Sequence, residues 1–300
     1  MAENKKYLIG IGTNKAGTTS LFNYLGDHPK ITPSVSKQLN YFFDAETTAI
    51  EAQGKWERPY NEAFKTDRQS EYLLDISPDY MYDLNVAERI NKELGSKNVY
   101  ILCILRDPVD RFKSWFNYSK QNGHLQEDIR FNEFISKQDE SQATKSPFAA
   151  LKTGKYLTFL HPFIQHFPHF KVIFTEDLKS KPKEILEEIT TWLNIDNDIY
   201  KDYTFNTYNK TVKVKNRGLE KKYLGIHGWV KRGLINLPFF FNLFKPFGKY
   251  FSAVMKRKNS QSLDNQELDD KSLKKAYIQS VTDLEKELKL KTPWKRFHHV

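Results

Sequence analysis

The chain has 300 residues, of which 39% are hydrophobic, so it is long enough to bury a full core in one domain with an extension. Its formal charge of +10 favours an anionic cofactor, an acidic substrate or an anionic surface. Nucleic acid fits the charge alone, but the lysines are scattered and no known reader motif is present, so we expect no nucleic-acid partner. The single cysteine, Cys103, excludes a disulfide framework and a cysteine metal cluster.

The first predicted elements are a short apolar strand at residues 7–11, a glycine-containing loop at 12–20 and a helix whose apolar positions begin at residue 21. A strand that starts this early leaves no room for a signal peptide. No apolar run reaches the roughly 18–20 residues that are needed to span a bilayer. We therefore expect a cytoplasmic protein.

The loop between this strand and helix has the features of a phosphate site, because free backbone N–H groups and the positive end of a helix dipole face one spot. Lys15 adds a charge, and Thr18, Thr19 and Ser20 add hydroxyl donors. The loop differs from a Walker A motif, G-x-x-x-x-G-K-[ST], because Thr18 follows the second glycine and the lysine lies inside the loop. It also differs from the dinucleotide motif G-x-G-x-x-G, because Lys15 stands where the third glycine belongs.

The run Lys15-Ala16-Gly17-Thr18-Thr19-Ser20-Leu21 resembles the 5′-phosphosulfate loop of sulfotransferases, which use 3′-phosphoadenosine 5′-phosphosulfate (PAPS). The resemblance implies that residues 15–20 bind the 5′ side of PAPS. It also implies that Lys15 neutralises charge on the bridging oxygen that leaves. An ordinary turn with a hydroxyl-rich helix cap is the alternative that the residues alone leave open.

The remaining predicted strands are short apolar runs at residues 31–32, 72–76, 99–105 and 170–174. The run at 99–105 is the most hydrophobic, so we expect it at the centre of a parallel sheet. Further helices are predicted at residues 85–94, from 108 onward, and at 131–135, 157–167, 182–193 and 268–290. The polar stretch 45–69 predicts one or two more, with an inward aromatic stripe formed by Trp56, Tyr60 and Phe64.

A second candidate binding element follows the strand at 99–105. Asp107 as N-cap and Pro108 as the first helical residue begin a helix there. Arg106 therefore lies at the carboxyl end of a strand, where open α/β sheets bind ligands, and Ser114 lies two turns into the helix on the side of its N-cap. Sulfotransferases have an Arg and a Ser at this spacing, and the resemblance implies that they bind the 3′-phosphate of PAPS. The alternative is that Arg106 only pairs with Asp110.

The C-terminal third is basic and aromatic. The resemblance assigns Arg217 and Gly218 to a late loop that closes over the nucleotide, although a plain solvated loop is equally consistent with the residues. Residues 234–254 are apolar with basic flanks and are interpreted as a docked core segment, an acceptor-site wall or a peripheral membrane contact. Trp294 resembles a tryptophan near the end of many bacterial sulfotransferase chains. We predict an α/β domain at 1–222 and a helical and aromatic extension at 223–300.

The catalytic base is predicted from a departure from the family pattern. Gln38 stands where the stretch Lys-Glu-Leu-His-Tyr-Phe of the family has its glutamate. Glutamine can orient an acceptor hydroxyl but cannot take its proton. Asp75, at the carboxyl end of another strand, can converge with Lys15 above the sheet and is our predicted base. The alternative is that Asp75 only caps the turn after it, in which case His28 and His124 are the next candidates.

The resemblance covers most of the chain and is greatest to the branch with bacterial and heparan sulfate sulfotransferases. It implies a three-layer α/β fold with a parallel sheet, related to P-loop kinases, and PAPS as sulfuryl donor without a metal. The acceptor is expected to be a polysaccharide, a glycolipid or a small hydroxylated molecule. Two alternatives are a P-loop nucleotide kinase or NTPase, which needs Mg²⁺, and a catalytically inactive homologue that binds carbohydrate or membrane.

Overall fold

The computed structural model describes residues 5–43, 59–64, 70–126, 128–206, 213–214, 260–261 and 270–298. Contacts divide the chain into two compact units. The first comprises residues 1–117, 128–209 and 269–300, and it contains the α/β fold. The second comprises residues 118–127 and 210–268, where β6 (Lys213–Val214) pairs antiparallel with β7 (Ser260–Gln261).

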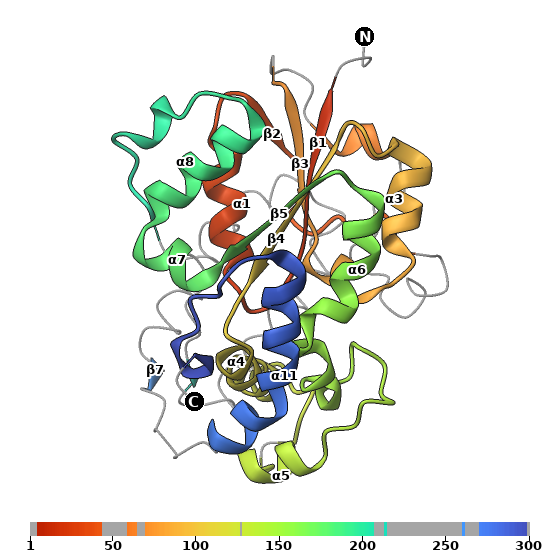
Figure 1. Cartoon of the computed structure of the whole chain (residues 1–300), viewed down its shortest axis with the longest axis vertical. Coiled ribbons are helices and arrows are strands. Elements are labelled where there is room, and N and C mark those ends of the chain that lie inside the picture. Colours follow the sequence, from red (N-terminus) through yellow and green to blue (C-terminus); the bar gives the residue numbers. More distant parts are fainter. Residues whose placement is uncertain are drawn as a thin grey trace, which may run out of the picture. The chain divides into compact units, whose positions relative to one another are not determined.

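The first unit is built on one sheet of five parallel strands in the order β2-β3-β1-β4-β5 (Figure 1). The strands are β1 (Lys6–Gly12), β2 (Ile31–Pro33), β3 (Tyr72–Ile76), β4 (Val99–Leu105) and β5 (His169–Phe174). Each predicted strand is present. The prediction that 99–105 is central was wrong, because β1 is the middle strand. Both β1 and β4 pair on two sides and are buried, so hydrophobicity alone does not order them.

Helices cover both faces of the sheet, with α1 and α8 on one side and α3 and α6 on the other (Figure 1). The side chains of Leu8, Leu74, Leu102 and Ile104 pack in one core cluster with α1 and α8. The α-helices of the described residues are α1 (Thr18–Gly26), α3 (Val86–Leu94), α4 (Pro108–Gln121), α5 (Phe131–Ser136), α6 (Tyr156–His166), α7 (Thr175–Ser180), α8 (Pro182–Leu193) and α11 (Asp270–Leu288). The three-layer α/β prediction is therefore confirmed.

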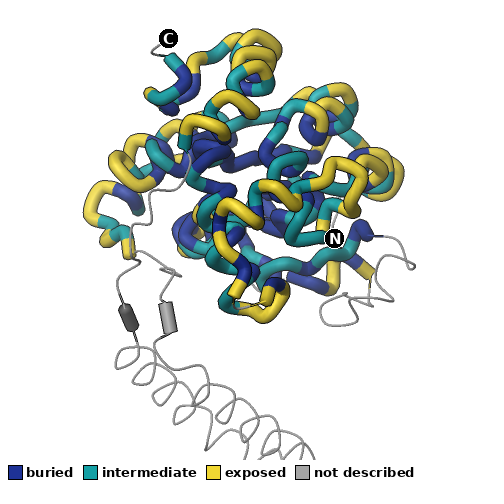
Figure 2. Tube along the Cα trace, turned by 90° about the horizontal axis from the view of Figure 1, so that it is seen from below, coloured by how far each residue is buried: buried dark blue, intermediate teal, exposed yellow. Residues whose placement is uncertain are grey.

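The predicted helix boundaries follow from local chemistry. Asp107 caps α4, since its Oδ1 accepts hydrogen bonds from the backbone N–H groups of Val109 at 2.9 Å and Asp110 at 3.2 Å. Gly95 ends α3 with a φ of 72°, a conformation that glycine adopts without strain. Figure 2 shows the buried residues gathered in the interior and the exposed ones on the outer turns of the chain, and the residues of β1, β3 and β4 are mostly buried.

The C-terminal helix α11 belongs to the same compact unit as the sheet and contacts α6. A 3-10 turn at Lys295–Phe297 follows it. The predicted domain boundary between residues 222 and 223, the segment 234–254 and Trp56 lie outside the described residues. Of the stretch 45–69, only residues 59–64 are described, and they form a 3-10 turn at Tyr60–Ala63. Among the described residues, no helix combines the length and the apolar character that crossing a bilayer requires.

Candidate active site

The loop between β1 and α1 is held tightly against the end of the sheet. The backbone N–H of Thr13 donates to the carbonyl of Ile104 in β4, at 2.7 Å. A Cβ on Gly12 would lie 2.6 Å from the sulfur and 2.9 Å from the Cβ of Met81, so any other residue there would displace Met81. Gly17, at φ 89°, is the N-cap of α1 and has no side chain to bond the first N–H groups of the helix, and no acidic residue lies in its first turn. These features suit an anion that the loop surrounds.

The two predicted donor-binding cations lie together. Nη1 of Arg106 donates a hydrogen bond to the backbone carbonyl of Lys15, at 3.0 Å. Burial lowers the pKa of the Lys15 ammonium, and the nearby charge of Arg106 lowers it further. Two cations that disfavour each other in this way would be stabilised by a bound anion. The structure therefore brings residues 15–20 and Arg106 to one site, while Ser114 lies half-buried on α4.

The alternative interpretation, in which Arg106 pairs with Asp110, does not agree with the structure. Asp110 pairs with Nη2 of Arg296 at 2.8 Å. Among the described residues, no carboxylate lies within ion-pair distance of the Arg106 guanidinium. Arg217 and Gly218, the other predicted donor-binding residues, lie outside the described residues.

Arg111 is a residue of the donor side that the sequence interpretation missed. Its side chain is 1% exposed. Nε donates to the hydroxyl of Thr13 at 3.1 Å and Nη2 to that of Thr153 at 2.9 Å, while Nη1 lies 3.4 Å from the carbonyl of Ala150. No carboxylate within the described ranges pairs with it. A signal was present, because Arg111 is four residues after the N-cap of α4 and three before Ser114, on one side of the helix.

The predicted acceptor side is the segment 37–43, which folds onto the end of β3. The backbone N–H of Gln38 donates to the carbonyl of Ile76 at 3.2 Å, and that of Asn40 donates to the hydroxyl of Ser77 at 3.1 Å. Gln38 and Asn40 have positive φ values of 64° and 52°. The half-buried Gln38 is thus held at the carboxyl end of β3, the strand that carries Asp75.

Asp75 is 0% exposed, and its carboxylate accepts hydrogen bonds from several segments. Oδ1 accepts from the Ser77 hydroxyl at 2.8 Å, and Oδ2 accepts from Tyr80 at 3.0 Å and Tyr60 at 3.3 Å. Burial raises the pKa of Asp75 to about 6, although the hydrogen bonds, including one from the Leu39 backbone, act to lower it. Asp75 therefore does more than cap the following turn. Its role as a base stays a prediction.

One polar link joins the two sides of the site. The Asn14 side chain donates a hydrogen bond to Oδ1 of Asp79, so the donor loop contacts the 3-10 turn after β3, Pro78–Tyr82. Burial lowers the pKa of Lys37, and the charges of Asp79 and Asp75 oppose that effect. Asn14, Asp79 and Lys37 were not among the predicted site residues.

The other candidate bases are His28, which has structural partners, and His124. In the buried His28, Nδ1 accepts from the backbone N–H of Lys30 at 3.1 Å, and Nε2 lies 2.9 Å from the carbonyl of Asp196. His124 belongs to the second unit. Among the described residues, no group of three or more His, Cys, Asp or Glu side chains could hold a metal ion.

Comparison with known families matches residues 5–232 to the sulfotransferase domain. The membrane-associated sulfotransferase kil1 of Dictyostelium discoideum is 34% identical over 113 residues, which are 38% of this chain and 23% of that protein. Heparan sulfate glucosamine 3-O-sulfotransferase 3A1 of Mus musculus is 24% identical over 189 residues, which are 62% of this chain and 45% of that protein. The chain thus covers less than half the length of these relatives.

A crystal structure of a sulfotransferase from Alicyclobacillus acidocaldarius is 21% identical in sequence and has a TM-score of 0.57. The alignment covers 74% of this chain and 90% of that one. This likeness establishes a shared fold.

Proposed function

Because this chain belongs to the sulfotransferase family, we propose that it transfers a sulfuryl group from PAPS to a hydroxyl or amine of a carbohydrate or lipid-linked acceptor. The observation that carries the proposal is the contact between Arg106 and the loop of Lys15. The motifs assign these cations to the 3′ and 5′ sides of one donor, and the contact supports a single site for both.

The residues of the donor side fit PAPS in charge and in donor type. The loop N–H groups and the hydroxyls of Thr18, Thr19 and Ser20 would hold its 5′ side, and Arg106 with Ser114 its 3′-phosphate. PAPS supplies an activated sulfuryl group. Lys15 stabilises the negative charge that develops on the leaving side, an effect that is strong in a site with little water.

On the acceptor side we assign orientation of the acceptor to Gln38 and receipt of its proton to Asp75. Since burial raises the pKa of Asp75 to about 6, the carboxylate is ionised at neutral pH and can still take a proton. Asp75 has no exposed surface, and neither have Ser77 and Tyr80, so the proton reaches it through the hydroxyl of Tyr60, which is 3% exposed and contacts Oδ2.

The acceptor class and the location are part of the proposal. Support for a carbohydrate acceptor comes from the net charge of +10 and from similarity to a heparan sulfate sulfotransferase. Support for peripheral contact at the inner face of the membrane comes from the sequence of 234–254 and the similarity to a membrane-associated sulfotransferase. If this is correct, the protein co-sediments with anionic liposomes and is released at high salt, because ions screen part of the attraction.

A transfer assay with labelled PAPS tests the function directly. The protein is incubated in EDTA with glycan and glycolipid acceptors, and we expect label in at least one acceptor, with Lys15→Ala as the inactive control. The product 3′-phosphoadenosine 5′-phosphate (PAP) should stabilise the fold by about 2.7 kcal/mol at a hundred times its Kd. Binding of PAP without transfer to any acceptor would favour the inactive homologue, and binding of ATP only with Mg²⁺ would favour a kinase or NTPase.

A further inference from the structure

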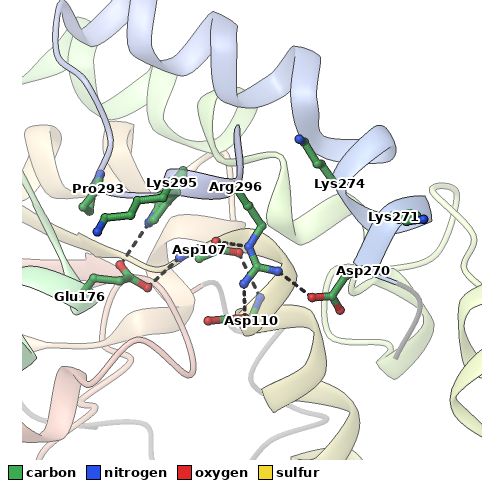
Figure 3. A pocket seen from close by; sticks show the side chains of 10 residues that line it. Asp107, Asp110, Glu176, Asp270, Lys271, Lys274, Pro293, Lys295 and Arg296 are labelled. Atoms are coloured by element: carbon green, nitrogen blue, oxygen red, sulfur yellow. Dashed lines mark hydrogen bonds and ion pairs between the residues drawn. The ribbon is translucent and has the colours of Figure 1, made fainter. Parts of the chain in front are cut away.

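The C-terminal segment forms ion pairs with the start of α4. Figure 3 shows a pocket between this segment, α11 and the first turn of α4, with the side chain of Arg296 among three carboxylates. Nε of Arg296 lies 2.7 Å from Asp107, Nη2 lies 2.8 Å from Asp110, and Nη1 lies 3.1 Å from Asp270. Asp107 is also the N-cap of α4, so one carboxylate both starts the helix and binds Arg296.

Trp294, which is 1% exposed, is linked to the start of α4 through the side chain of Glu176. Its indole N–H donates to Oε2 of Glu176 at 3.1 Å, and Oε1 of Glu176 accepts from the backbone N–H of Asp107 at 3.1 Å. On the other side of this peptide unit, the carbonyl of Arg106 accepts from the Tyr156 hydroxyl at 2.7 Å. The peptide between Arg106 and Asp107 is therefore held at both of its polar groups.

These contacts have an electrostatic consequence for Arg106. Asp107 and Asp110 are the acids nearest to it in sequence, and both are bound to Arg296. The Arg106 guanidinium contacts the carbonyl of Lys15 instead. Without Arg296, an unpaired carboxylate in the first turn of α4 would attract the guanidinium and compete with an anionic ligand.

We propose that Arg296 and Trp294, together called the C-terminal clasp, are positioning residues for recognition of the 3′-phosphate. Arg296 occupies the acids of the first turn of α4, and Trp294 fixes through Glu176 the peptide that carries Arg106. The clasp thereby keeps Arg106 directed at the donor. This inference rests on the proposed function, because it assumes that Arg106 binds the 3′-phosphate of PAPS.

The test compares two ligands that differ only in the 3′-phosphate. Calorimetry gives Kd for PAP and for adenosine 5′-phosphate with the wild-type chain and with Arg296→Gln. We expect the ratio of the two Kd values to fall about tenfold in Arg296→Gln, the scale of one charged hydrogen bond. Binding of adenosine 5′-phosphate should stay within about twofold, because its contacts are with the loop at 12–20.

A double variant separates positioning from simple loss of structure. Arg296→Gln combined with Asp110→Asn should recover part of the lost ratio, because one of the two carboxylates that Arg296 binds in the first turn of α4 is then neutral. Lys171→Gln serves as the control, since it breaks a remote ion pair, 2.7 Å long, between β5 and Glu188 of α8. The control should leave the ratio unchanged.

The outcomes are distinct. A wild-type chain that does not distinguish PAP from adenosine 5′-phosphate contradicts the proposed function itself. If Arg296→Gln prefers PAP over adenosine 5′-phosphate as strongly as the wild type does, the inference about the clasp is wrong. It is also wrong if Arg296→Gln binds both ligands more weakly by the same factor. If Arg296→Gln does not fold, Trp294→Phe replaces it, because it removes the indole N–H that bonds to Glu176 and keeps an aromatic ring. An unchanged ratio in Trp294→Phe then overturns the inference, and a reduced ratio supports it.

Discussion

The donor side and the acceptor side of the site each contain a buried charged group that forms no ion pair within the described residues. Arg111 lies below the donor loop at 1% exposure, and Asp75 lies at the end of β3 at 0% exposure. Arg111 bonds to neutral oxygens of Thr13, Thr153 and Ala150, and Asp75 accepts from neutral hydroxyls. Among the described residues, neither forms an ion pair.

Arg111 and Asp75 differ in whether the side chain can gain or lose a proton near neutral pH. An arginine keeps its charge at any pH at which the protein is folded, so Arg111 is a permanent positive charge behind the loop that we assign to an anionic donor. Burial raises the pKa of Asp75 to about 6, so its charge depends on pH and its proton can exchange. The donor side thus has a fixed charge, and the acceptor side has a titratable one.

The largest expected effect tests the titratable charge. Asp75→Asn keeps the shape of the side chain but cannot take a proton, so kcat should fall by about 10²- to 10⁴-fold while the Kd of PAP is unchanged. Steady-state kinetics with calorimetry measure both. Gln38→Glu should retain or raise activity, because it introduces a second base. Full turnover by Asp75→Asn would remove Asp75 as the base.

The fixed charge is tested by Arg111→Met, which keeps much of the volume but leaves Thr13, Thr153 and Ala150 without their donor. We expect the free energy of unfolding to fall by roughly 3 kcal/mol, the cost of several unsatisfied buried groups. Both PAP and adenosine 5′-phosphate should bind about tenfold more weakly, because the charge lies behind the 5′ loop. Chemical denaturation and calorimetry provide the two readouts. A loss of stability with unchanged affinities would assign Arg111 to the fold alone.

The two buried acids predict a pH dependence of stability. Burial raises the pKa of Asp75 from an ordinary 3.8 to about 6. Between these values the folded state binds more protons than the unfolded state, so the free energy of unfolding falls as pH rises from about 4 to about 6. The contribution is about 3 kcal/mol. Asp107 acts in the same direction, because burial also raises its pKa to about 6, against the effect of Arg296.

Denaturation of the wild type and of Asp75→Asn at several pH values isolates this effect. The wild type should lose more stability than the variant as pH rises through this window. Parallel stability curves for the two proteins would show that the charge of Asp75 is not disfavoured in the folded state.

A smaller effect is expected on acceptor binding. Gln38→Ala removes an amide that we assign to acceptor orientation, and we expect KM for the acceptor to rise about tenfold, the scale of a lost hydrogen bond. The Kd of PAP should stay the same, because Gln38 is held on β3 and not on the donor loop. A change in donor affinity without a change in acceptor KM would place Gln38 on the other side of the site.

The strands, the helices and the donor motifs could be predicted from the sequence, because each of them is a pattern of residues that are close together in the chain. The strands are continuous apolar runs, and the contact between Lys15 and Arg106 follows from two strand ends at one edge of the sheet. The order of β1 and β4 was not predictable in this way. The partners of the buried charges were missed because they are distant, as Thr13 is 98 residues from Arg111 and Asp110 is 186 residues from Arg296.

The most direct test of the account is whether Arg106 recognises a 3′-phosphate. Calorimetry in EDTA should give tighter binding of PAP than of adenosine 5′-phosphate by the wild type. Arg106→Ala should weaken PAP binding by about 1.5–3 kcal/mol, roughly 10- to 150-fold in Kd, and leave adenosine 5′-phosphate nearly unaffected. Equal binding of the two ligands by the wild type, or equal losses in Arg106→Ala, would contradict the account.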